Sequence, residues 1–537
     1  MPYLRWTRGL SLLCLGTLLL CPVHAQDLQP ASSASQTVAL TLDDALQLAF
    51  AQNYALRSAQ LDVATAQQQV REGWGTLYPQ VSANSSYTRT LVAPNPFAGS
   101  QAGDLFSSFG AIDWLVFNED ARSDDDPSTN PIPLGDFFER RQDGLDEAGI
   151  VQDTGGNPFL VENQFQNGIT ISQSLFDLRA FLGASGASTY LQAQANAALD
   201  RQEQLLIDEV RRNFYQALLT QRSIDVLQAS VTRTSATLNE VAQRVTQGVL
   251  PKYQRLSTEV SLSNLETQLV QARAQAATSL DVLKMTLGMP VEQPIRLVGQ
   301  LEVDQLDLFR MTSLNAAVEA AITQRPDLEQ LRHTIALQQV NVRATQASFY
   351  PTVNAFANFS FTGSVPSNRN FTISDPNDPF RFTAGSNGFF SGSYWDPGVN
   401  VGLQLRWDIF TGFQNRARLQ QQQIQLDRLE VQESQALQAI RLEILQARRN
   451  LDAARQRIVA QEQTIQTAEL NYQFARTRLA EGVATRLEER DASTQLDQSR
   501  LNYAQAVHDY LVARSAFQTA IGAPLLDADS NLNMTAR

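Results

Sequence analysis

The chain repeats itself, and this duplication constrains its fold more than any other feature of the sequence. A shift of 234 residues matches one part of the two copies without a gap: Phe176 with Phe410, Gly248 with Gly482, Gly288 with Gly522 and Pro290 with Pro524. A shift of 272 residues matches the part before it: Leu42 with Leu314, Leu56 with Leu328 and Tyr78 with Tyr350. Because the two shifts differ by 38 residues, the first copy carries an insertion between these parts. The sequence therefore predicts one architecture built twice in tandem.

The second part of each copy is typical of a very long helix, a tight reversal and a returning helix. Residues 180–247 contain no proline, and glycine only near their start. About 68 residues at roughly 1.5 Å each make a rod on the order of 100 Å. Gly248 permits the positive φ needed to leave a helix, and Pro251 suits the first turn of the next one. We therefore predict helical hairpins over 180–288 and 413–521, each with a tip turn.

Between the helices the hydrophobic period changes from 3.6 to 2. This alternation predicts four strands, apolar on one face and polar on the other: 79–91, 159–175, 351–362 and 398–410. In the last, Val399 and Val401 alternate with Asn400. The strands fit either half-buried sheets on a core or a membrane barrel with a polar, wet lumen. Polar-face charges such as Arg406 and Asp408 favour the barrel, because a charge is costly in a core.

Four strands cannot close a barrel, because the smallest membrane barrels have about eight. Open strand edges are not tolerated in lipid. If these strands cross a membrane, several copies of the chain must therefore share one barrel. Two copies would supply about eight strands and three would supply about twelve.

The N-terminus has the pattern of a secretory signal peptide. Residues 1–25 comprise a basic start, an apolar run and a small-x-small cleavage site that ends at Ala25. Both cysteines, Cys14 and Cys21, lie in this segment, so the mature chain would be cysteine-free. No other stretch approaches about 18 consecutive apolar residues, so we expect no transmembrane helix.

The remaining chain divides into two repeats, a linker and a tail. The first repeat spans 26–289 and the second spans 313–524. The linker between them is 290–312, and the tail is 525–537. Each repeat opens with a helix: 41–73 and 313–347. A loop separates the two strands of each repeat, and the loop 92–158 is longer and more acidic than 363–397. We expect both to be solvated surface loops.

Helix lengths predict how the hairpins close. The descending helix has about 68 residues, whereas the returning helix 253–287 has about 35. The helix 313–347 supplies about 35 more before the next strand, so we expect these two to stack end to end. By the same logic, 486–521 should stack on the N-terminal helix 42–71. The linker 290–312 would then form an equatorial belt at mid-height.

Composition argues against several functions. The net charge of −13 argues against a nucleic-acid partner. Beyond the signal peptide there are two histidines, His333 and His508, which are too few for a metal cluster. We find no phosphate-binding glycine-rich loop and no nucleophile elbow. We therefore predict no catalytic residue, no cofactor, no metal and no enzymatic activity.

Taken together, the pattern resembles the TolC-like outer membrane efflux proteins. The resemblance rests on the tandem repeat, on Tyr-Pro before the first strand of each copy, and on four further passages: 171–176, 405–410, 244–249 and 478–483. It implies an α+β membrane protein that forms a homotrimer. The twelve strands, four from each protomer, would form one outer membrane β-barrel. This barrel would continue into a long periplasmic α-helical barrel.

The resemblance also implies site residues. Tip turns that dock a periplasmic adaptor would comprise Gln247, Gly248, Val249, Glu481, Gly482 and Val483. A constriction at the entrance would comprise Leu479, Ala484, Glu488, Asp491 and Gln254. Glu488 and Asp491 match the acidic rings of some family members. Leu479, Ala484 and Gln254 stand where other members have a polar gate, so closure would rest on packing rather than on a salt-bridged lock.

The predicted function is a passive exit duct of a tripartite efflux or type I secretion system. It would conduct substrates from an inner-membrane pump across the periplasm and outer membrane. Its partners would be two further copies, a periplasmic adaptor, a pump of the RND, ABC or MFS type, and outer membrane lipid. Two alternatives stay open: a periplasmic coiled-coil adaptor or scaffold, and a free-standing outer membrane pore.

Overall fold

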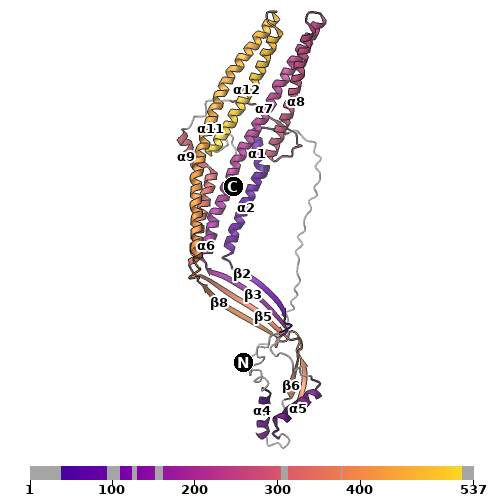
Figure 1. The fold of residues 1–537 in the computed structure, drawn as a ribbon, viewed down its shortest axis with the longest axis vertical. Helices are drawn as coiled ribbons and strands as arrows, with labels where there is room; N and C mark the ends of the chain where they lie inside the picture. The colour runs from indigo at the N-terminus through magenta and orange to yellow at the C-terminus, as the bar shows by residue number, and fades with distance from the viewer. Residues whose placement is uncertain are drawn as a thin grey trace, which may run out of the picture.

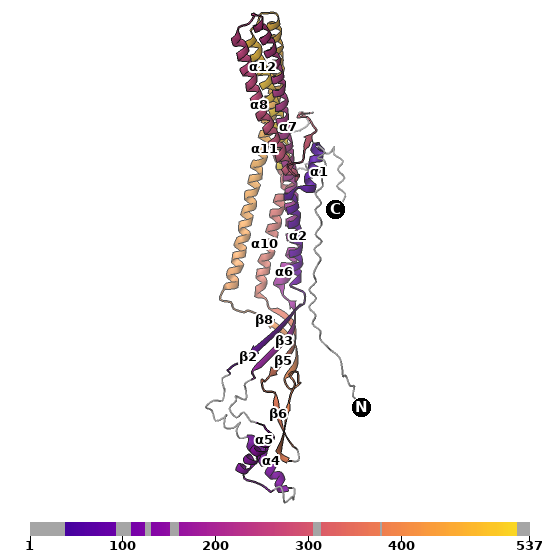
Figure 2. The same cartoon turned by 90° about the vertical axis from the view of Figure 1, so that its right-hand side faces the viewer.

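The computed structural model describes six stretches of the chain: 38–92, 109–123, 130–150, 161–303, 313–375 and 378–522. The predicted signal peptide and the tail 525–537 lie outside the described residues, as do parts of the loop 92–158 and of the linker 290–312. The described chain is elongated. Paired helices occupy one end, a sheet follows, and a small cap lies beyond the sheet (Figure 1). A view turned by 90° shows the same order along the long axis (Figure 2).

Each repeat opens with two helices where the sequence predicted one. The pairs are α1 (Leu42–Gln52) with α2 (Tyr54–Gly75), and α9 (Leu314–Gln324) with α10 (Pro326–Gln346). They meet at Asn53 and Arg325, whose ψ angles of 129° and 118° are extended. Arg325 leaves the helical conformation because Pro326 follows it. Asn53 does so while its side chain caps the Leu56 amide over 2.9 Å. The predicted helices 41–73 and 313–347 are therefore each divided.

The long helices differ between the repeats. In the first, α6 (Leu178–Gly186) passes through the π-helical turn η1 (Ala187–Leu191) into α7 (Gln192–Thr246), and α8 (Lys252–Leu287) returns. In the second, α11 (Gln414–Ala480) is unbroken over 67 residues, and α12 (Arg486–Ile521) returns. The π turn interrupts the predicted single helix where Gly186 packs closely on α10. A Cβ at Gly186 would lie 2.4 Å from Val340.

The half-length helices stack within each repeat, which corrects the expected pairing between repeats. α8 ends on the α1–α2 junction, where the Asn53 side-chain amide donates to the Thr286 carbonyl over 2.8 Å. α12 ends on the α9–α10 junction, where Arg325 donates to the Ala520 carbonyl over 3.1 Å. Helix length allows either pairing, because α8 and α12 both have 36 residues. In each repeat one polar side chain at the junction, Asn53 or Arg325, donates a hydrogen bond to the end of the returning helix and so stabilises the observed pairing.

One antiparallel sheet contains four strands in the order β2 (Gln80–Arg89), β3 (Asn163–Phe176), β5 (Thr352–Val365) and β8 (Trp395–Arg406). Its register aligns two adjacent rows: Val81, Ile171, Ala357 and Val401, then Ser82, Thr170, Asn358 and Asn400. Adjacent rows face opposite sides of a sheet. One face is therefore apolar and the other polar. β2 and β8 are the two edges, with no described strand beyond them.

The last strand ends earlier than the predicted 410. After β8 the chain turns, and Arg406 pairs with Asp408 over 3.2 Å. Gly412 and Phe413 then both have positive φ, 61° and 64°, which keeps α11 from starting at the predicted 413.

The two predicted outer loops contain regular structure, which corrects the expectation of solvated loops. The first includes α4 (Phe109–Ser123) and α5 (Leu134–Glu147), and the second folds into the hairpin β6 (Asn370–Asp375) and β7 (Asp378–Ser386). Three rings, of Phe117, Phe137 and Phe380, pack with centroids 5.2–5.6 Å apart. Phe137 and Leu145 are each only 2% exposed. This aromatic core holds the loops together as the cap.

Two hydrophobic cores lie in the helical part, one in each repeat. The first includes Leu56, Val210 and Leu283, and the second includes Ile444 and Val507. The short strand β1 (Val38–Leu40) pairs in parallel with β4 (Ile295–Leu297) beside the first core. Among the described helices, none combines the length and apolar composition that a membrane span requires.

Candidate functional site

The two tip turns share one backbone geometry. Gly248 and Gly482 follow the ends of α7 and α11 with φ angles of 76° and 78°. The amides of Val249 and Val483 each donate over 2.9 Å to the carbonyl five residues earlier. This arrangement satisfies the last helical carbonyls and reverses the chain. Both valine side chains are about two-thirds exposed, at 67% and 66%.

The other two predicted tip residues are the C-caps of the long helices. Gln247 ends α7 and Glu481 ends α11, both in helical conformation. Together with the glycines and valines they form the two free ends of the hairpins (Figure 1). A partner that approaches along the helix axes meets these six residues.

The candidate constriction residues are divided between the hairpins. Leu479, Ala484, Glu488 and Asp491 all belong to the second tip or the first turns of α12, whereas Gln254 lies in the first turn of α8. No hydrogen bond or ion pair within the described chain joins Gln254 to the second tip, and its Oε1 is buried without a partner. The structure does not bring the five residues together within one chain.

Glu488 caps the N-terminus of α12, a role that the resemblance did not imply. Its Oε1 accepts from the Thr485 amide over 3.3 Å and from the Thr485 hydroxyl over 3.0 Å, which completes a capping box. Its Oε2 lies 3.8 Å from Arg478. Asp491 is less engaged: its side chain is 66% exposed and lies 3.6 Å from Arg490. Of the two predicted carboxylates, Asp491 is the one more accessible to a passing cation.

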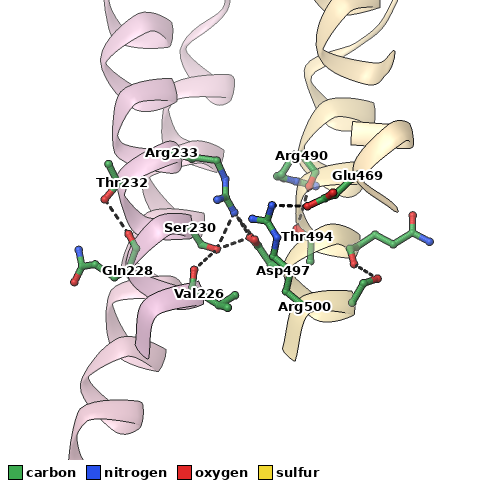
Figure 3. Close-up of polar contacts among 12 residues, drawn as sticks. Val226, Gln228, Ser230, Thr232, Arg233, Glu469, Arg490, Thr494, Asp497 and Arg500 are labelled. Carbon is green, nitrogen blue, oxygen red and sulfur yellow. Dashed lines mark hydrogen bonds and ion pairs between the residues drawn. The ribbon is translucent and has the colours of Figure 1, made fainter. Parts of the chain in front are cut away.

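An ionic cluster joins the two hairpins below the tips (Figure 3). Arg233 of α7 donates to both carboxylate oxygens of Asp497 on α12 and, over 3.1 Å, to the Ser230 hydroxyl. Ser230 also donates to Asp497. The side chains of Arg233 and Asp497 are only 27% and 16% exposed. This cluster therefore lies in the contact between α7 and α12 rather than on a solvated surface.

Two further pairs hold α12 in place. Closer to the tip, Arg486 of α12 lies 2.6 Å from Glu240 of α7, which is also 2.8 Å from Arg244. On its other side, Arg500 bonds Glu469 of α11 over 2.9 Å (Figure 3). Helix α12 is therefore tied to both long helices by ion pairs. The expectation that closure of the entrance rests on packing stays a prediction.

Glu489 of α12 lies near the charges of Arg486 and Glu240. Burial raises the pKa of the Glu489 carboxyl, and the nearby charge of Glu240 raises it further. Arg486 and Arg476 act in the opposite direction without cancelling the effect. Protonation of Glu489 therefore begins at a higher pH than that of an ordinary glutamate.

The sequence could not identify the Arg233–Asp497 cluster. Each residue is a single charge on a long helix, and such charges are usually solvated. Their meeting depends on α12 lying against α7, a neighbour relation that helix lengths left open. Among the described residues, no three His, Cys, Asp or Glu side chains gather as a metal site.

Comparison with known proteins gives a consistent result. Residues 317–523 match the model of the family described as outer membrane efflux protein. The chain is 23% identical over 353 residues to the alkaline protease secretion protein AprF of Pseudomonas aeruginosa, covering 64% of this chain and 67% of AprF. It is 25% identical over 319 residues to the probable efflux pump outer membrane protein TtgC of Pseudomonas putida, covering 59% and 53%.

The fold is similar to that of solved channels of the same kind. The crystal structure of the CmeC outer membrane channel of Campylobacter jejuni superposes with a TM-score of 0.65 at 14% identity. The superposition covers 90% of this chain and 85% of CmeC. The predicted resemblance and the predicted outer membrane location are thus confirmed. By its fold and by the match of its second repeat to the family model, the chain is similar to the TolC-like outer membrane efflux proteins.

Proposed function

We propose that three copies of this chain form the passive exit duct of a tripartite export system. The observation that carries the proposal is the two-faced sheet joined directly to long helical hairpins. Its apolar face suits lipid, and its polar face suits a water-filled lumen. The helices would extend the lumen across the periplasm. No part of the duct supplies energy, which would come from the partner pump.

The sheet edges support the need for several copies. β2 and β8 each have one side without a described partner strand, and unpaired backbone groups are not tolerated in lipid. Pairing β2 of one copy with β8 of the next would remove both edges. Three copies would give a closed barrel of twelve strands, four from each chain. Native mass spectrometry of the detergent-extracted protein tests this count, and any stoichiometry other than three would refute it.

The tips would dock a periplasmic adaptor, which would link the duct to an inner-membrane pump of the RND, ABC or MFS type. Val249 and Val483 are about two-thirds exposed and give each tip turn an apolar side chain for contact with a partner. The related AprF is named for protease secretion and TtgC for an efflux pump. Protease secretion and drug efflux would both require the same passive duct, so the partner pump would determine the substrate class.

A cross-linking experiment tests the docking. The mature chain lacks cysteine, so Gln247→Cys gives one attachment point for a photo-cross-linker. We expect the tip to capture a periplasmic adaptor in intact cells. The same probe at Ser434, an exposed position within α11, is the matched control and should not capture it. A tip that captures nothing, in a protein that fractionates with the outer membrane, would favour the free-standing pore.

Opening of the entrance would require α12 to move away from α7. The contacts between Arg233, Ser230 and Asp497 oppose this movement. Ser230→Cys together with Asp497→Cys places two thiols at this contact. We expect their oxidation to block export and their reduction to restore it, with each single variant as a control. Export that continues at full rate with the disulfide formed would contradict the iris-like opening.

A further inference from the structure

The cap contains a hollow that the exit duct does not use. It has a volume of about 840 Å³ and opens between α4, α5 and β7. Small-molecule sites typically span about 300–1,000 Å³. Phe117 of α4 and Phe380 of β7 line the hollow as half-buried rings. Because the walls come from the outer loops of both repeats, the hollow exists only when the cap is folded.

Four charged side chains line the hollow without an ion pair or hydrogen bond to any described residue. They are Arg140, Asp143 and Glu147 of α5 and Arg381 of β7. Arg140 lies over the Phe380 ring, 5.9 Å from its centre. A fifth charge, Asp378, already accepts the Phe380 amide over 3.0 Å through one oxygen. The hollow therefore offers charged donors and acceptors that no other described residue engages, beside aromatic faces.

This mixture selects among ligand classes. A simple anion would meet three carboxylates, and a metal cation would meet two guanidinium groups at the same rim. A purely apolar molecule would strip water from these charges and give nothing in return. A saccharide fits both parts of the site. Its hydroxyl groups donate to carboxylates and accept from guanidinium groups, while its C–H faces cover aromatic rings.

We propose that the cap hollow binds a saccharide of the cell surface. The assignment rests on the proposed duct, because the cap then lies beyond the outer end of the membrane-spanning sheet (Figure 1). The long loops of a membrane barrel lie on the extracellular side, so the proposed duct would present the cap to the saccharides of the cell surface. Arg381 of β7 and Asp143 of α5 both line the hollow, so each of the two elements contributes a charged side chain to it. The duct would thereby be anchored in the surface glycan layer through a site apart from its lumen.

Titration calorimetry on the full-length protein in detergent tests the proposal. The probe is the delipidated core oligosaccharide of lipopolysaccharide from the native bacterium. We expect saturable binding that weakens about tenfold or more in Arg381→Gln and in Asp143→Asn, because each removes a charged hydrogen-bond group. Arg122→Gln on α4 and Asp136→Asn on α5 are matched controls outside the hollow, and both should bind like the unaltered protein.

The outcomes separate this proposal from the exit duct. No saturable binding, or equal binding by all four variants, would overturn the saccharide site while tip cross-linking still reports on the duct. Binding of phosphorylethanolamine or of a Lys-Gly-Asp peptide in the hollow, with no binding of the oligosaccharide, would also overturn it. Selective loss of oligosaccharide binding in Arg381→Gln and Asp143→Asn, with export unchanged, supports it.

Discussion

Arg325 is a buried charge on which one helix stack depends. Its side chain is 3% exposed where α12 ends on α9 and α10. The guanidinium donates to Asp327 over 3.0 and 2.6 Å, to Glu443 over 2.7 Å and to the Ala520 carbonyl over 3.1 Å. We predict that Arg325→Met loosens the end of α12, because methionine fills similar space but replaces none of these bonds.

The size of the effect follows from the exposure of the partners. Removing one member of a buried ion pair costs about 3–5 kcal/mol when the other charge stays buried. Here the side chains of Asp327 and Glu443 are 34% and 45% exposed, so water can solvate the carboxylates that remain. We therefore expect the free energy of opening the stack to fall by about 2–3 kcal/mol, at or below the lower end of that range.

Hydrogen exchange of the last turns of α12 measures this change, because exchange reports the local opening free energy. About 2–3 kcal/mol corresponds to about 30- to 140-fold faster exchange. The first repeat supplies an internal control: its stack is held by Asn53 and should not change. Arg343→Met replaces an exposed arginine of α10 with the same residue and should leave exchange at the end of α12 unchanged. Exchange at the end of α12 within about threefold of the unaltered protein would refute the reasoning.

The ion pair between Arg325 and Asp327 makes the stability of this helix stack depend on pH, and the direction can be predicted. Burial acts to raise the pKa of Asp327, but the hydrogen bonds and charge of Arg325 outweigh it and hold the pKa below the ordinary 3.8. A lowered folded-state pKa contributes stability above the unfolded value, and this contribution is lost as the pH falls through the folded value. The difference between the unaltered protein and Arg325→Met should therefore narrow below about pH 4. A constant difference down to lower pH would contradict this assignment.

Three further changes have expected outcomes. In the cap, Gly144→Ala should make the loop helices sensitive to limited proteolysis, because its Cβ would lie 1.8 Å from a backbone oxygen of β7, whereas Gly135→Ala meets nothing within 4 Å and should not. At the tip, Gly482→Ala should cost about 1–2 kcal/mol in local stability, because its φ is 78°; unchanged hydrogen exchange in the turn would contradict this. At the entrance, Asp497→Asn should raise single-channel conductance in planar bilayers, because it removes the ion pair that holds α12 against α7; a conductance equal to that of the unaltered protein would contradict this.

The sequence could predict those parts of the candidate site that depend on neighbouring residues in the chain. The tip turns depend on glycine in a left-handed conformation after a long helix, and Gly248 and Gly482 signal this directly. The division at Arg325 was also readable, because Pro326 follows it, and the continuous-helix expectation overlooked this signal. The Arg233–Asp497 cluster carried no such signal, since its two members lie 264 residues apart in the sequence.

The sequence by itself determined the tandem repeat, the long hairpins and the alternating strands, because each depends on periodicity within one segment. Only the tertiary structure decided which half-length helices stack, since α8 and α12 have the same length and either pairing would fit. It also decided that the two outer loops fold into one cap. Phe137 and Phe380 come from different repeats, and their aromatic core forms only when the sheet brings both loops to the same end. The hydrophobic period of a segment shows whether it is a helix or a strand and which of its faces is buried. Which other segment packs on that face depends on contacts between residues far apart in the sequence.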